Sequence, residues 1–157
     1  MRKKVVDQVP ESASARGQEW FDLERLTRVE VTSESAACPI ESALIPGTGP
    51  GWQAAQPGEQ TIRIIFDQPQ ELTRILLVFH EEAHARTQEF VLRWLPNGEE
   101  RLREILRQQY TFSPPDTTRQ TEDYGVDLNG VRALELQIVP DISGSGACAT
   151  LAQLRLA

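Results

Sequence analysis

Short runs of alternating apolar and polar residues, separated by proline and glycine, constrain the fold of this chain most. The alternation occurs at residues 28–32, 61–66 and 90–95, with the period of two that is typical of a half-buried strand. Between the first two runs, residues 38–58 contain the turn-rich run Pro46–Gly51, which excludes a helix or a central strand there. No regular alternation of strands with helices is seen, so the pattern predicts an all-β antiparallel sandwich.

The remaining strands are predicted from apolar runs and their breakers. Ile75–Phe79 is a continuous apolar run of five residues, as in a central strand that is covered on both faces. Before it, Asp67–Pro69 is expected to close the preceding strand. Residues 131–139 are strand-like and stop at Pro140, and residues 154–156 form the last strand. We therefore expect about eight strands and little helix.

One segment, Glu99–Gln109, fits two kinds of structure. Leu102, Ile105 and Leu106 have the spacing of a helix face, but the same segment can also be read as a strand. We favour the strand because the elements on both sides of it are strands.

The two cysteines, Cys38 and Cys148, lie far apart in the sequence. The first and last strands carry complementary patterns, and antiparallel pairing between them would bring the two thiols close together. A disulfide and two free thiols both stay open, with free thiols the default for a cytoplasmic chain.

Charge and length exclude several classes of partner. The chain has 157 residues, which suits one domain, and its 16 basic and 23 acidic residues give a net charge of −7. This charge disfavours a nucleic acid as partner, and no apolar run approaches the ~20 residues of a membrane span. The basic segment Met1–Val6 is not followed by the apolar region of a signal peptide, so we expect a cytoplasmic location. Residues 1–19 are expected to form a flexible N-terminal arm, and residues 20–157 the domain.

Both histidines lie in His80-Glu81-Glu82-Ala83-His84, which fits the H-E-x-x-H pattern of zinc peptidases. On a helix, His80 and His84 would share a face and ligate one zinc, while Glu81 would activate its water. However, no N-cap residue precedes His80, and no third histidine exists to complete the ligand set. We therefore favour a loop between two strands, where these residues form a polar binding edge, a weak metal site or plain solvated surface.

Several segments share their order and spacing with one family of β-sandwich domains; they are Val29–Ser33, the Gly-rich turn before Trp52, Pro57–Ile62, Ile64–Phe66, Leu72–Phe79, Phe90–Trp94, the turn Asn97-Gly98, Val131–Leu136 and Ala149–Leu156. Over about residues 20–157 the chain resembles a discoidin, or coagulation-factor C-type, domain of the galactose-binding-like superfamily. The resemblance implies a jelly-roll sandwich with a non-catalytic ligand-binding site at one end.

The resemblance also implies which loops form the site. They map to Glu34–Ile40, Gly47–Gln56 and His80–Arg86. Many relatives bind a structural calcium through a hydroxyl or carbonyl just before the tryptophan of the second loop and a glutamate near the end of the domain. Here Gly51 precedes the tryptophan and Gln153 stands where the glutamate is expected, so structural calcium is disfavoured and no cofactor is expected.

We therefore expect a non-catalytic module that binds a small polar ligand, above all a carbohydrate. His80, Glu82, His84 and Arg86 would hydrogen-bond to hydroxyl groups, while Trp52 would support the site from below. The alternative is a protein–protein interaction adaptor on the same fold, which would use the loops or an exposed sheet face. A further alternative is a zinc-dependent hydrolase built on the H-E-x-x-H motif.

Overall fold

The computed structural model describes residues 19–157, which form eight strands and two short helices. The elements in chain order are α2 (Leu23–Leu26), β1 (Thr27–Val31), α3 (Glu41–Leu44), β2 (Trp52–Pro57), β3 (Gln60–His80), β4 (Arg86–Pro96), β5 (Arg103–Phe112), β6 (Arg119–Val139), β7 (Cys148–Leu151) and β8 (Gln153–Leu156). The expected all-β class with little helix is confirmed. The arm expected at residues 1–19 falls outside the described residues, apart from Glu19.

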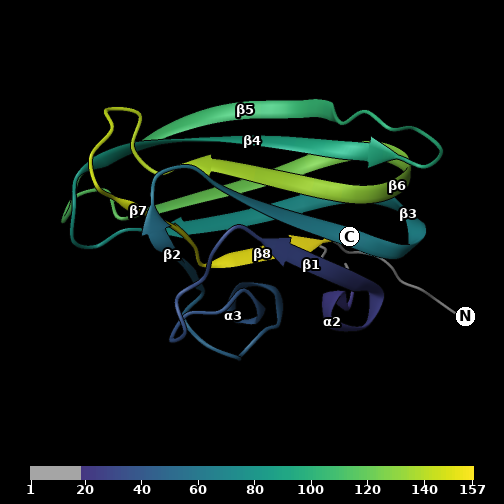
Figure 1. Ribbon diagram of the computed structural model, residues 1–157, viewed down its shortest axis with the longest axis horizontal. Helices are drawn as coiled ribbons and strands as arrows, with labels where there is room; N and C mark the ends of the chain where they lie inside the picture. Colours follow the sequence, from purple (N-terminus) through teal and green to yellow (C-terminus); the bar gives the residue numbers. More distant parts are fainter. Residues whose placement is uncertain (1–18) are drawn as a thin grey trace, which may run out of the picture.

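Two long strands, β3 and β6, contribute to both layers of the sandwich (Figure 1). They pair antiparallel from Gln60 to Ile65 and again from Arg74 to His80, with register shifts in between. The first half of β3 carries β1 on its other edge, whereas the second half carries β8. One layer therefore has the order β1-β3-β6-β4-β5, and the other consists of β8 with the remaining halves of β3 and β6.

The expectation that Asp67–Pro69 ends a strand is wrong, because β3 continues through this segment to His80. The pairing with β6 shifts register around these residues, which is how a strand absorbs a proline and bends. The breaker residues thus mark the bend at which β3 passes from one layer to the other.

Alternation along the strands produces the core between the layers. Ile62 and Ile64 in one half of β3, and Ile75 and Leu77 in the other, are buried, as the period of two requires. Aromatic rings join the two layers near the loop end, where the ring centroids of Phe79 on β3 and Phe90 on β4 are 5.2 Å apart.

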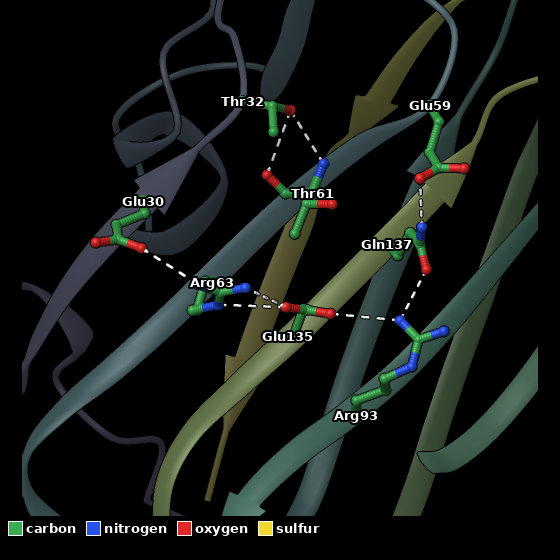
Figure 2. Close-up of polar contacts among 8 residues, drawn as sticks. All are labelled: Glu30, Thr32, Glu59, Thr61, Arg63, Arg93, Glu135 and Gln137. Atoms are coloured by element: carbon green, nitrogen blue, oxygen red, sulfur yellow. Dashed lines mark hydrogen bonds and ion pairs between the residues drawn. The ribbon is translucent and has the colours of Figure 1, made fainter. Parts of the chain in front are cut away.

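The outer face of the five-stranded layer carries a row of paired charges. Register places Glu30, Arg63, Glu135 and Arg93 side by side on β1, β3, β6 and β4. Figure 2 shows Glu135 between two guanidinium groups, with Arg63 Nη2 at 2.6 Å from its Oε1 and Arg93 Nη1 at 3.3 Å from its Oε2. Opposite charges on neighbouring strands stabilise one register over its one-residue slips.

The expected pairing of the first and last strands is wrong. β8 pairs with the second half of β3, and β1 pairs with the first half. Both short strands fit the apolar alternation of β3, and the length of β3 gives each a separate place. Cys38 and Cys148 are both free thiols, and Cys148 lies opposite Pro57 in the β2–β7 ribbon.

The ambiguous segment Glu99–Gln109 contains a strand, as favoured from its neighbours. β5 begins at Arg103 and pairs with β4 along its length. The residues before it form the connection from β4, where Leu102 stays 36% exposed. The apparent helical spacing of Leu102 with Leu106 therefore joins a connecting residue to a strand residue.

Candidate functional site

The H-E-x-x-H motif lies in the loop between β3 and β4, as favoured from the sequence. β3 ends at His80 and β4 begins at Arg86, with bends at Glu82 and Ala83. The two histidines are not one helical turn apart, so the geometry that a zinc peptidase requires is not present. Among the described residues, no group of three or more metal-ligating side chains gathers at a common point.

Glu81 organises this loop from within. Its carboxylate accepts hydrogen bonds from Arg86 Nε at 2.7 Å and from the backbone amides of Ala83 and His84 at 3.0 and 3.1 Å. Burial raises the pKa of Glu81, but the bonds from Arg86 and the two amides outweigh it, so the pKa lies below its usual range. The residue that a peptidase would use as a base is therefore held as an anion by its own loop.

Arg86 was expected to contact ligand directly, but its side chain is fully buried, with 0% of its surface exposed. The guanidinium of Arg86 lies over the ring of Phe112, with its central carbon 4.8 Å from the ring centroid. It donates to acceptors from four segments, namely Glu81 Oε1, Gln88 Oε1, the Pro140 carbonyl and Thr150 Oγ1. The structure thus makes Arg86 a positioning residue, which joins the β3–β4 loop to β7 and to the end of β6.

The three loops implied by the resemblance meet at one hollow of about 150 Å³, here called the His80 hollow. Trp52 is only 1% exposed and forms part of its floor, with its indole N–H donating to the Ser33 carbonyl at 3.1 Å. The expected support of a bound ligand by Trp52 stays a prediction. The lining residues come from all three loops and from β7; they are Cys38, Pro50, Gly51, Trp52, Gln53, His80, Thr150, Leu151 and Ala152.

The walls of the His80 hollow are held by backbone hydrogen bonds. The amide of Gln53 donates to the Cys38 carbonyl at 3.1 Å, and the amide of Ser35 donates to the Gln53 carbonyl at 2.8 Å. The Thr150 hydroxyl donates to the His80 carbonyl at 3.1 Å. These bonds fix the loops relative to one another without using the side chains of Gln53 or His80.

The polar side chains that face solvent at this hollow are His80 and Gln53. The His80 side chain is 42% exposed, and its Nε2 lies 3.2 Å from Oε2 of Glu82, which orients the ring. Gln53 is exposed and was missed from the sequence. It follows the inward-facing Trp52 in a strand, so alternation alone could have placed it outward. No local sequence pattern predicts that Thr150 lines the same hollow.

His84 does not reach the His80 hollow but lines a second one of about 380 Å³, here called the His84 hollow. The other lining residues are Ala85 and the segment 145–147. The structure thus separates the two histidines that the sequence analysis grouped in one site.

Asp141 holds the wall of the His84 hollow, and its carboxyl group should stay ionised to a lower pH than an ordinary aspartate. Hydrogen bonds from the Ser145 hydroxyl and from the amide and hydroxyl of Ser143 lower its pKa to about 2, against the opposing effect of burial. Because this lies below the unfolded value of about 3.9, its contribution to stability is complete above pH ~4 and is lost as the pH falls towards 2.

We expect the Asp141 carboxyl carbon in an NMR titration to show no midpoint above pH 3, and the loss of stability between pH 4 and 2 to shrink in Asp141→Asn. A midpoint near 4 would show that the Ser143 and Ser145 bonds do not form in solution.

A third hollow, of about 440 Å³, lies on the outer face of the five-stranded layer. Its charged side chains already satisfy one another, since Arg63 bridges Glu30 and Glu135 (Figure 2). No aromatic residue is among its described lining residues, so it offers no ring platform to a sugar. The expectation of an adaptor that uses an exposed sheet face stays a prediction.

Comparisons with known proteins agree on the architecture. No protein-family model and no curated protein sequence matches the chain. Among solved structures, the family 32 carbohydrate-binding module of AlyQ, in complex with 4,5-unsaturated mannuronic acid, superposes with a TM-score of 0.64 at 12% identity, covering 89% of this chain and 98% of that chain. Family 32 modules are discoidin-like domains. The chain has the discoidin-like fold.

Two further discoidin-like structures from Clostridium perfringens are similar. CpGH89CBM32-5, in complex with GalNAc-β-1,3-galactose, has a TM-score of 0.59 at 14% identity, covering 88% of this chain and 99% of that chain. The family 32 module of NanJ, in complex with galactose, has a TM-score of 0.53 at 18% identity, covering 83% of this chain and 92% of that chain. At identities this low, the structural likeness shows the fold alone, and this fold is the one that the sequence resemblance implied. Within the described part of the chain, no helix is long and apolar enough to cross a membrane.

Proposed function

We propose that this chain is a non-catalytic module that binds a neutral carbohydrate in the His80 hollow. The observation that carries the proposal is the convergence of three separate loops on one hollow, with His80 and Gln53 exposed above a floor that includes the buried Trp52. Rigid walls with a few outward polar groups are what recognition of sugar hydroxyls requires. The similar modules bound to sugars support a carbohydrate as the ligand, and two of them hold neutral sugars.

The charges around the hollow favour a neutral sugar. No lysine or arginine is among the described lining residues, and the carboxylate of Glu82 lies beside the His80 ring. A sugar carboxylate here would face Glu82 without a cation to pair with, because Arg86 is buried and its donors are engaged. We therefore expect galactose or N-acetylgalactosamine to bind more tightly than a uronic acid.

The residues have distinct roles in this proposal. The His80 ring and the Gln53 amide hydrogen-bond to hydroxyl groups, and Glu82 orients the ring of His80. Glu81 and Arg86 hold the loop in its binding conformation, so that little ordering is needed when the sugar binds. Calcium has no part in the proposal, and its absence from the site stays a prediction.

We expect His80→Ala to weaken the binding of galactose about five- to tenfold, which is the loss of one to two hydrogen bonds to hydroxyl groups. Isothermal titration calorimetry with galactose, N-acetylgalactosamine and galacturonic acid measures the affinities. Arg101→Ala is the matched control, because Arg101 is exposed in the β4–β5 connection and lines none of the three hollows. Equal affinities of the two variants, or no detectable heat with any of the sugars, would refute the proposal.

A further inference from the structure

The His84 hollow offers hydrogen-bonding groups and room for a second sugar unit. The His84 imidazole is exposed and makes no hydrogen bond to another described residue, so its donor and acceptor are both available. Ala85, Gly146 and Ala147 present small side chains beside it, which leaves room for a ligand to approach the backbone. The other described lining residues carry no ionisable side chain.

The His80 and His84 hollows lie close together because one short loop connects them. Three residues lie between the two histidines, so their Cα atoms are four chain steps and at most about 14 Å apart. On the other side, the segment 145–147 that lines the His84 hollow runs directly into β7, whose Thr150 lines the His80 hollow. A short oligosaccharide can span this separation.

The walls of the His84 hollow are held in place before any ligand binds. The Asp141 carboxylate caps the loop through Ser143, and the amide of Ile142 donates to the Thr87 carbonyl at 2.8 Å. On the other side, the amide of Gly58 donates to the Ala147 carbonyl at 3.2 Å. On the loop side, the carboxylate of Glu81 holds the His84 amide. A hollow with fixed walls is more typical of a ligand subsite than of a gap between mobile loops.

We infer that the His84 hollow is a second subsite, so that the ligand is a neutral oligosaccharide of at least two units that extends from His80 to His84. This inference rests on the proposed carbohydrate-binding function of the His80 hollow. Contacts at both ends of the β3–β4 loop make a disaccharide a better ligand than its terminal unit alone. The uncharged lining favours hydroxyl and acetamido groups over carboxylates in the second unit.

The test compares galactose with N-acetylgalactosamine-β-1,3-galactose by calorimetry and NMR. We expect the disaccharide to bind about tenfold more tightly than galactose. The chain has only two histidines, so its imidazole Cε1–H spectrum contains two signals that variants can assign. The disaccharide should shift both signals, whereas galactose should shift mainly that of His80.

Two variants probe the His84 hollow alone. In His84→Ala, the ratio of disaccharide to galactose affinity should fall to near one. In Gly146→Leu, the new side chain fills the hollow and should have the same effect; the backbone allows it, because Gly146 does not have a positive φ and a Cβ there meets no atom within 4 Å. Binding of both sugars with equal affinity, with the His84 signal unmoved, would overturn the second subsite and leave the proposed function intact. Binding of neither sugar would overturn both.

Discussion

Replacing Arg86 by alanine should destabilise the protein by about 3–5 kcal/mol, the cost of removing one partner from a buried ion pair. The buried guanidinium is the common donor to the Glu81 carboxylate, the Pro140 carbonyl and Thr150, so its loss leaves buried acceptors without partners. It also removes the group that packs over Phe112. Urea unfolding at neutral pH, followed by tryptophan fluorescence, measures the change in the free energy of unfolding.

Arg86→Lys separates charge from geometry. Lysine keeps the positive charge but cannot present the planar fork of donors that reaches several segments at once, so most of the loss should remain. The exposed Arg101→Ala is again the control and should change stability by less than about 0.5 kcal/mol. If Arg86→Ala unfolded at the same urea concentration as Arg101→Ala, the network assigned to Arg86 would not contribute to the fold.

Gly51→Ala should lower the free energy of unfolding by a comparable amount, about 2–5 kcal/mol, because the added methyl group would clash with the backbone. Gly51 has a φ of +127°, and an added Cβ would lie 2.6 Å from the Leu151 carbonyl oxygen and 2.7 Å from the Ala152 Cα. Both are backbone atoms where β7 ends and the chain turns into β8, so the β2–β7 ribbon must shift to make room. Because Gly51 and Leu151 also line the His80 hollow, the same substitution should reduce the affinity for galactose.

Gly47→Ala provides the matched comparison. Gly47 also has a positive φ, +78°, but a Cβ there meets nothing within 4 Å, so only the backbone strain of about 1–2 kcal/mol applies. The difference between the two variants in urea unfolding isolates the close approach of the two chain segments. Equal losses at Gly47 and Gly51 would mean that the tight contact with β7 does not exist in solution.

The strands were predictable because alternation is a local signal that burial makes necessary. The polarity of Val29–Val31, Ile62–Phe66 and Phe90–Trp94 was sufficient to place three of them. The pairing of strands was harder to predict, because the apolar pattern of β8 fits β1 and β3 equally well. Only the length and the bend of β3 decide between these two partners. A bend at Pro69 and a strand end at Pro69 also have the same sequence signature.

The meeting of the three loops was predictable from the sequence, but the placement of individual side chains around them was not. The absence of an N-cap before His80 correctly indicated a loop, and the resemblance implied the three loops that meet there. The burial of Arg86 could not be foreseen, because its partners at Pro140 and Thr150 are more than fifty residues away in the sequence. The separation of His80 from His84 into two hollows likewise depends on β7 and the loop before it, which no local pattern specifies.

A crystal structure of the protein with bound galactose tests the account most directly. We predict that the sugar lies in the His80 hollow, with its hydroxyl groups within hydrogen-bonding distance of the His80 ring and the Gln53 amide. Galactose bound to the outer face of the five-stranded layer, with the His80 hollow left vacant, would contradict the account.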